Sequence, residues 1–320
     1  MKAVVVGAGG IGQRIAQQLG EAGHEVVLAS RSGSGIGPDI SATPSPAVGV
    51  ARVDASDAAA LGGLAADADV LVNAVNPPYT RWPELWPPMS AAFLAAAERS
   101  GAGLLIVGNL YGYGPVTTPM TESTPLATTG VKGGVRATMW RDALAAHQAG
   151  RLRAVELRAS DYFGPGATKG ISYLNQYAIA PAVRGRTAQH VRGDMDAPHS
   201  WTYLADIARL AVAVVETDRS GVDWGRAWHV PTSAPVTMRE VAAQVADVAG
   251  VEAHQPRLYP RLLSTALRVV PLIRELDETA YQFDRPFLLD SSAAQQRFGL
   301  APTPWRDALA ETVRWMQSQA

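Results

Sequence analysis

Short apolar runs alternate with amphipathic stretches along the first half of the chain. Residues 2–6 form a short apolar run, which is typical of a strand buried on both faces of a sheet. Ile11, Ile15 and Leu19 then recur every four residues and predict a helix with one apolar face. A second apolar run follows at residues 25–29. This order predicts a strand, a helix and a second strand.

The same alternation continues to about residue 160. It predicts an α/β fold of the Rossmann type, in which a doubly wound parallel sheet carries helices on both faces. Ligands of such folds bind at the carboxyl ends of the strands. Further strands are expected at residues 48–53, 69–73, 103–107 and 153–157, and helices at 57–66, capped by Ser56, at 87–99 and at 131–149.

The pattern loosens in the second half of the chain, which is typical of a smaller substrate lobe. We expect a dinucleotide-binding domain over residues 1–162 and a C-terminal substrate lobe over residues 163–320. A strand at 227–230 is expected to bring the segment 200–231 back to the main sheet. Helices are expected at residues 204–216, 238–249 and 305–317, the second with a capping-box pattern at Thr237 and Glu240.

The turn between the first strand and the first helix is rich in glycine: Gly7-Ala-Gly9-Gly10-Ile11-Gly12. Gly7 allows a tight turn, Gly9 lets a pyrophosphate approach the backbone, and Gly12 lets the helix pack closely on the strand. The helix N-terminus adds unpaired N–H groups and a positive dipole end. The turn therefore predicts a dinucleotide site that includes Gly10 and Ile11 at its phosphate end.

The residues after the second strand favour NADP over NAD as the cofactor. An NAD site usually has Asp or Glu at this place, where the carboxylate binds the ribose 2′-hydroxyl. Here the chain reads Ser30-Arg31-Ser32. An arginine neutralises a 2′-phosphate, and the two serines donate hydrogen bonds to it. The alternative is that Arg31 is a solvated loop arginine that does not contact the cofactor. NAD is the less favoured cofactor.

Composition and charge exclude several classes of function. The net charge of −1 and the absence of a basic block argue against nucleic acid or an anionic membrane as a partner. The first strand leaves no room for a signal peptide, and no apolar stretch reaches about 18 residues, so we expect a cytoplasmic protein. The chain has no cysteine, and its six histidines lack metal-ligand spacing, so no metal site is expected.

Six short runs, taken in order, resemble motifs of the extended short-chain dehydrogenase/reductases of the NAD-dependent epimerase/dehydratase type. The resemblance covers nearly the whole chain and implies that Asp54 lies near the adenine and that Asn73 and Ala74 lie alongside the cofactor. It also implies a homodimer formed through the helices at 87–99 and 131–149. The runs begin at Asp54, Asn73, Leu157, Trp201, Leu289 and Phe298.

The catalytic residues of that family are replaced in this chain. Such enzymes carry Ser or Thr after the fifth strand, where this chain has Asn109. They also carry Tyr-x-x-x-Lys on the next helix, where this chain reads Lys132-Gly-Gly-Val-Arg136. A second alignment would place Thr128 at the tyrosine position and Lys132 at the lysine position. The tyrosine that moves the proton is absent in both alignments.

Several side chains are candidates for the missing chemistry. Lys132, next to the cation Arg136 and an oxidised nicotinamide, is expected to lose charge readily and to serve as a general acid. Asn109 would polarise the substrate carbonyl, and Arg136 would hold the nicotinamide ribose or a substrate carboxylate. Tyr111 is an alternative proton donor. The alternative for Lys132 is an exposed lysine of the first helical turn without function.

Candidates for substrate contact occur in two places, just after the fourth expected strand and within the expected substrate lobe. Tyr79 and Trp82 would form an aromatic wall for an apolar or ring-bearing substrate, or else pack under a loop. His199 is expected near the substrate, with acid/base chemistry as one role and a structural histidine as the other. A sugar-nucleotide substrate would need cations for its diphosphate, for which Arg184, Arg186 and Arg192 are candidates.

These features together lead to three hypotheses about function. The first is an NADP(H)-dependent oxidoreductase that acts on a small carbonyl or hydroxyl compound through a non-standard proton relay. The second is an NAD(P)-dependent epimerase or dehydratase. The third is a non-catalytic NADP-binding sensor or scaffold, which the loss of the catalytic residues would also predict.

Overall fold

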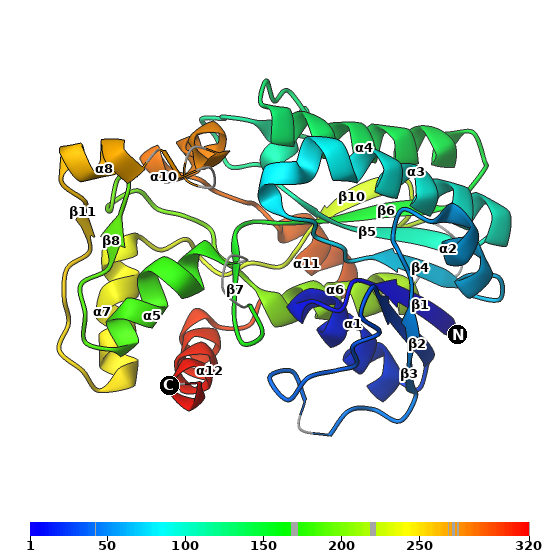
Figure 1. Cartoon of the computed structure of the whole chain (residues 1–320), viewed down its shortest axis with the longest axis horizontal. Coiled ribbons are helices and arrows are strands. Elements are labelled where there is room, and N and C mark those ends of the chain that lie inside the picture. Colours follow the sequence, from blue (N-terminus) through cyan, green and yellow to red (C-terminus); the bar gives the residue numbers. More distant parts are fainter. Residues whose placement is uncertain are drawn as a thin grey trace.

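Seven parallel strands form the central sheet of the computed structural model, which describes residues 1–41, 43–167, 172–217, 222–267, 269–270, 273 and 275–319. The strand order is β10-β6-β5-β4-β1-β2-β3 (Figure 1). This arrangement confirms the doubly wound fold expected from the alternation of apolar runs. The strands are β1 (Lys2–Val6), β2 (Glu25–Ser30), β3 (Val48–Arg52), β4 (Val70–Asn73), β5 (Gly103–Asn109), β6 (Ala154–Ala159) and β10 (Arg226–His229).

Helices cover both faces of the sheet, and each buries an apolar stripe against it (Figure 1). On one face Ile15 and Leu19 of the first helix pack with Ile207 of α6. On the other face Phe93 of α3 and Trp140 of α4 are buried. The first face holds α1 (Gly10–Glu21), α6 (Leu204–Thr217) and α11 (Ser292–Phe298), and the second holds α2 (Ala58–Leu64), α3 (Trp82–Ser100) and α4 (Val131–Gln148).

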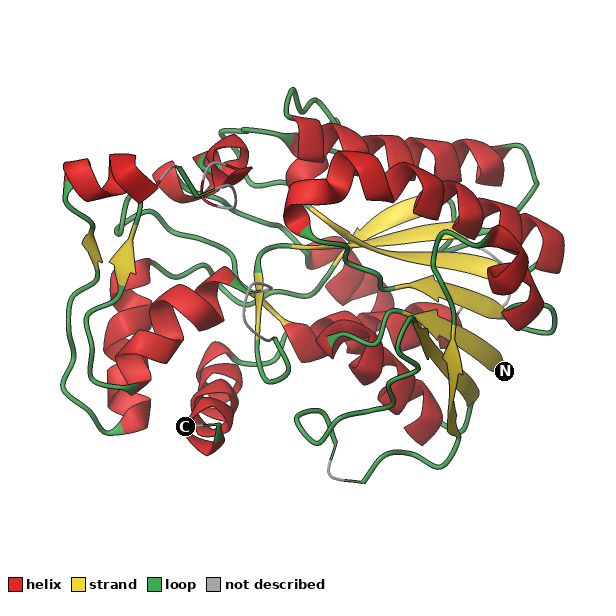
Figure 2. Cartoon of the chain, viewed as in Figure 1, coloured by secondary structure: helices red, strands yellow, loops and turns green. Residues whose placement is uncertain are grey.

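The second half of the chain builds a smaller, mostly helical lobe beside the sheet (Figure 2). Its core joins α5 (Ala180–Val183), α7 (Met238–Ala249) and α12 (Trp305–Ser318). Thr237 caps α7 in the capping box expected from the sequence. The remaining elements are β7 (Tyr162–Phe163), η3 (Asn175–Ile179), β8 (Gln189–His190), β9 (Thr202–Tyr203), β11 (Arg257–Leu258), α8 (Arg261–Leu267), η4 (Leu276–Thr279) and α10 (Tyr281–Asp284).

Two helix starts differ from the expectations. Asp57, not Ser56, caps α2, because its Oδ1 accepts the backbone N–H groups of Ala59 and Ala60 at 2.9 Å each. The helix expected at 87–99 begins at Trp82, so Pro87 and Pro88 lie inside it, and only Pro83 stands in the first turn, where a missing N–H costs no helical hydrogen bond. The short helix η1 (Tyr79–Arg81) leads directly into it.

The expected homodimer helices, α3 and α4, lie side by side along one face of the sheet (Figure 1). The dimer itself stays a prediction. Within the described ranges, no helix is both long enough and apolar enough to cross a membrane.

Candidate active site

The glycine turn has little room for side chains except where a phosphate is expected. Gly7 has a φ of +114°, and a Cβ there would lie 2.5 Å from the carbonyl oxygen of Ala74. A Cβ on Gly12 would lie 1.8 Å from the carbonyl oxygen of Gly7. At Gly9, the N-cap of α1, a Cβ would meet nothing within 4 Å. The open backbone at Gly9 and the N–H groups that begin at Gly10 fit a pyrophosphate.

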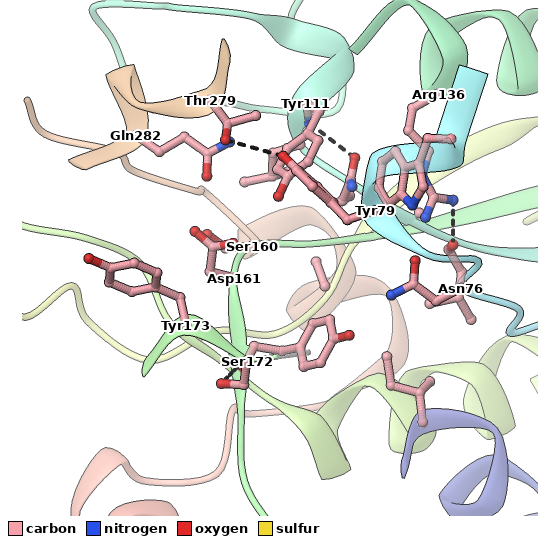
Figure 3. Close-up of a pocket in the computed structure, with 18 of the residues that line it drawn as sticks. Asn76, Tyr79, Tyr111, Arg136, Ser160, Asp161, Ser172, Tyr173, Thr279 and Gln282 are labelled. Carbon is pink, nitrogen blue, oxygen red and sulfur yellow. Dashed lines mark hydrogen bonds between the residues drawn. The ribbon is translucent and has the colours of Figure 1, made fainter. Parts of the chain in front are cut away.

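A cavity of about 440 Å³ lies where the carboxyl ends of β4, β5 and β6 meet the second lobe (Figure 3). Parallel strands present their carboxyl ends at one edge of the sheet, which is where such folds bind ligands. Ile11, within the glycine turn, also lines the cavity. Aromatic side chains from both halves of the chain line it as well: Tyr79, Trp82, Tyr111, Tyr162, Tyr173, Tyr177, Phe283 and Phe287.

Three of the expected cofactor residues line this cavity, namely Ile11, Arg31 and Ala74. The Ser30 and Ser32 hydroxyls lie 3.2 Å from each other beside Arg31. Ser30 is the last residue of β2, and Ser32 lies in the exposed loop that follows it. A cation with hydroxyls beside it is suited to a phosphate at this end of the cavity.

The other two expected cofactor residues already have hydrogen bonds within their own loops. The Asp54 carboxylate accepts from the Ser56 hydroxyl at 2.7 Å and from its backbone N–H at 2.9 Å. These hydrogen bonds, with a smaller contribution from the Arg31 charge, lower the pKa of Asp54. Asn73 is buried at the end of β4, where its Oδ1 accepts the Val75 N–H at 3.2 Å.

Arg136 of α4 reaches the cavity between two aromatic rings. Its guanidinium carbon lies 4.7 Å from the Trp82 ring centroid and 4.4 Å from that of Trp86. Its Nη1 donates to the Val107 carbonyl at 3.3 Å. Burial lowers the pKa of Arg136 to about 10, so the group is charged at neutral pH. Its buried Nε has no hydrogen-bond partner among the described residues.

Asn109, the last residue of β5, and Tyr111, two residues later, both line the cavity. Asn109 Oδ1 accepts the backbone N–H of Tyr111 at 3.1 Å, so its amide NH₂ is the half that can polarise a carbonyl. Tyr111, in the short helix η2 (Tyr111–Tyr113), is half-buried, and its desolvation raises the pKa of its phenol well above the usual value. A phenol with a raised pKa is a weaker acid at neutral pH.

Lys132 does not line the cavity. It is 1% exposed, and its Nζ pairs with the Glu275 carboxylate and lies 3.7 Å from Oε2 of Glu278. The ammonium also lies 4.6 Å from the centroid of the Tyr79 ring. In place of the cationic surroundings expected from the sequence, the structure therefore surrounds the Lys132 ammonium with two carboxylates. The expected alternative, an exposed lysine, also differs from this buried position.

The expected substrate residues differ in their access to the cavity. Tyr79 and Trp82 line it, with ring centroids 5.2 Å apart. His199 is buried and lies behind the cavity wall, where its Nε2 is 3.1 Å from Oδ2 of Asp161. Asp161 does line the cavity, so any effect of His199 on a substrate would pass through this carboxylate.

Sequence reasoning missed the polar groups in the middle of the cavity. Figure 3 shows Ser160 and Asp161 between Tyr173 on one side and Tyr79 with Tyr111 on the other. Both belong to the run Leu157-Arg-Ala-Ser-Asp-Tyr-Phe-Gly-Pro-Gly166 that was assigned only a family resemblance. Because they directly follow β6, their place at the carboxyl edge of the sheet was a usable signal.

The arginines considered for a diphosphate lie elsewhere. Arg192 donates to Asp277 at 3.1 Å and to Asp284 at 2.8 Å. Arg184 donates to the Ala180 carbonyl of its own helix. Among the described residues that line the cavity, the cations are Arg31 and Arg136. In the part of the chain that the structure describes, no group of three His, Cys, Asp or Glu side chains is placed to hold a metal ion.

Solved structures of sugar-nucleotide enzymes share this fold at low sequence identity. A dTDP-glucose 4,6-dehydratase from Bacillus anthracis in complex with NAD is 17% identical, with a TM-score of 0.78, over 99% of this chain and 97% of that chain. A UDP-N-acetylglucosamine 4-epimerase from Methanobrevibacter ruminantium is 18% identical, with a TM-score of 0.80, over 100% of this chain and 99% of that chain.

The sequence itself matches a family model over most of its length. The model of the NAD-dependent epimerase/dehydratase family matches residues 3–229, from β1 to the end of β10. No curated protein matches the chain. The matched segment contains the glycine turn, the whole central sheet and most of the cavity wall. The chain therefore belongs to the NAD-dependent epimerase/dehydratase family.

Proposed function

We propose that the protein is an NADP(H)-dependent oxidoreductase of the extended short-chain type that interconverts a small carbonyl compound and its alcohol. The glycine turn and the start of α1 would hold the pyrophosphate, and Arg136 would hold the nicotinamide ribose. The bound dihydronicotinamide supplies a hydride. This chain's own residues then have to orient the carbonyl, exclude water and deliver a proton to the carbonyl oxygen.

Arg31 supports NADP rather than NAD. It lines the cavity, as does Ile11 of the glycine turn, and it follows β2, where NAD sites usually have a carboxylate. The neighbouring serine hydroxyls add donors for a 2′-phosphate. The dehydratase from Bacillus anthracis carries NAD, so this chain would differ from that protein in cofactor preference.

The observation that carries the substrate proposal is the lining of the cavity. Eight aromatic side chains surround it, and they suit an apolar or ring-bearing compound. Of the two arginines that line the cavity, Arg136 is stacked between Trp82 and Trp86, and Arg31 is assigned to the cofactor. A substrate diphosphate would therefore have no further lining cation to pair with among the described residues. Asp161 adds a carboxylate in the middle of the cavity, which disfavours an anionic group there.

Membership of the family favours an epimerase or dehydratase as the second candidate. The solved structures with this fold include enzymes that act on UDP- and dTDP-sugars. In that reaction type the cofactor would be reduced and oxidised again within one turnover. Product would then form without net consumption of NADPH, which separates this candidate from the first.

A fluorescence titration with NADPH and NADH, followed by a turnover assay, tests the proposal. We expect NADPH to bind more tightly than NADH and to be consumed when an aromatic aldehyde such as benzaldehyde is added. Conversion of a UDP-sugar without NADPH consumption would favour the epimerase instead. Tight NADPH binding without turnover of either compound would favour the non-catalytic sensor, and absence of binding would exclude all three functions.

A further inference from the structure

The hydrogen bonds of His199 determine where its ring proton lies. Nδ1 is 3.1 Å from the backbone carbonyl oxygen of Gln282. A carbonyl oxygen can only accept a hydrogen bond, so Nδ1 carries a proton. In a neutral imidazole the other nitrogen, Nε2, is then unprotonated.

Nε2 of His199 faces a second acceptor. It lies 3.1 Å from Oδ2 of Asp161, within ion-pair distance, although the two atoms are not aligned as a hydrogen bond. Both atoms are buried, and neither has a hydrogen-bond partner among the described residues. Two buried lone pairs at this distance repel each other and remain unsatisfied. One additional proton, on Nε2 or on the carboxyl group, would replace the repulsion with a hydrogen bond and would satisfy both atoms.

The histidine ring is held in this orientation by its neighbours. Its centroid lies 3.9 Å from that of Trp201 and 5.4 Å from that of Phe283, and both rings are stacked on it. The His199 side chain is 5% exposed, whereas that of Asp161 is 18% exposed and lines the cavity. Rotation of the carboxyl group can therefore align the hydrogen bond, and only the carboxyl group reaches a bound substrate.

We propose that Asp161 and His199 share one proton and act as the acid/base pair of this enzyme, in place of the tyrosine that the chain lacks. The proposal rests on the oxidoreductase function proposed above. Asp161 is the catalytic residue because it lines the cavity. His199 is a positioning residue, because its ring is fixed by the Gln282 carbonyl and holds Nε2 beside the Asp161 carboxyl group.

The other titratable groups around the pair are phenols, which makes them poor competitors for this role. Burial raises the pKa of Tyr79 and of Tyr281 to about 12 and raises those of Tyr111, Tyr162 and Tyr173 as well. The charge of Asp161 contributes in the same direction at each of the five. All five phenols therefore stay protonated at neutral pH. The charge of Arg136 lowers the pKa of Tyr162 and so offsets part of the effect of burial on that phenol.

In the reduction of a ketone or aldehyde, the carbonyl carbon would accept a hydride from bound dihydronicotinamide, and the electron pair of the C=O π bond would move to oxygen. A proton passes from the Asp161 carboxyl group to that oxygen, so that an alcohol forms. The pair is left as a carboxylate beside a neutral imidazole, and a proton from solvent restores it.

Nitrogen NMR of the histidine side chains tests the shared proton without cofactor or substrate. We expect both ring nitrogens of His199 to carry protons at neutral pH, or Nδ1 alone with a strong hydrogen bond to Nε2 from a protonated Asp161. In Asp161→Asn the amide donates to Nε2 and only Nδ1 should remain protonated. An unprotonated Nε2 without a hydrogen bond in the wild-type protein would overturn the proposal.

Turnover of benzaldehyde with NADPH tests the catalytic role. Asp161→Asn and His199→Gln should each lower kcat about 100-fold or more, since general acids contribute this much, while the NADPH Kd stays within about twofold. His24→Gln is the matched control, because His24 lies 3.0 Å from Glu216 in a pair far from the cavity, and kcat should not change. Full activity in Asp161→Asn would overturn the proposal. Absence of turnover in the wild-type protein would instead contradict the proposed function, and the NMR result would still report the shared proton.

Discussion

Nζ of Lys132 lies 3.7 Å from Oε2 of Glu278, which joins the first turn of α4 to the segment that closes the cavity from the second lobe. The same glutamate accepts the backbone N–H of Lys132 at 2.6 Å. Gly130, the N-cap of α4, has no side chain to do this. Glu278 therefore caps the helix from a distant part of the chain, and its negative charge suits the helix N-terminus.

Lys132→Met is expected to destabilise the protein by roughly 3 kcal/mol, because it leaves two carboxylates without their buried cation. Urea unfolding at neutral pH measures this change. Lys2→Met is the matched control, since Lys2 lies 3.9 Å from the exposed Asp67 and such surface pairs contribute about 0–1 kcal/mol. Equal stabilities of the two variants would show that the Lys132 pair has no structural role.

Arg31→Ala is expected to weaken NADPH binding about 10- to 100-fold and NADH binding much less, because only NADPH has a 2′-phosphate to pair with the guanidinium. Fluorescence titration gives both values of Kd. Arg226→Ala, on the edge strand β10 against Trp228, should change neither. Loss of NADH binding to the same extent would mean that Arg31 supports the fold or another part of the cofactor.

Arg136→Met is expected to weaken NADPH binding about 10-fold or more, because it removes the guanidinium and its charge from the cavity wall. Arg136→Lys should recover only part of this loss, since an ammonium lacks the planar group that stacks between Trp82 and Trp86. Arg141→Met, on the exposed side of the same helix, is the control. Unchanged affinity in Arg136→Met would remove this residue from the cofactor site.

Acid should destabilise the protein partly through His190. Burial lowers the pKa of its imidazole from 6.5 to about 4, and its ring stacks on Tyr173, whose hydroxyl lies 2.8 Å from Nδ1. Between these two pH values the unfolded chain binds the proton and the folded chain does not, so stability falls as pH falls from 6.5 to about 4. The loss from this group reaches roughly 3 kcal/mol.

His190→Phe is therefore expected to flatten the dependence of unfolding free energy on pH over this range. Urea unfolding between neutral pH and pH 4.5 measures the slopes for both proteins. Burial also lowers the pKa of His229, which both proteins retain, so part of the slope should persist. Parallel curves for the variant and the wild-type protein would contradict the assignment to His190.

Local sequence patterns were sufficient for the architecture. The glycine turn and the runs of apolar residues act through neighbours within a few positions, because helices and strands are held by short-range periodicity. The seven-stranded parallel sheet, including its last strand near residue 227, could therefore be predicted. Helix starts were less predictable, since Ser56 and Asp57 are both good caps and only the backbone geometry selects Asp57.

The surroundings of the candidate catalytic groups depended on contacts between distant parts of the chain. Lys132 and Glu275 are 143 residues apart, and His199 and Gln282 are 83 residues apart. The sequence by itself determined that Gly7 to Gly12 and Arg31 lie at the carboxyl edge of a Rossmann sheet. Only the tertiary structure decided that Lys132 is paired with carboxylates and that Asp161 faces His199, because no local periodicity relates residues that the second lobe brings together on folding.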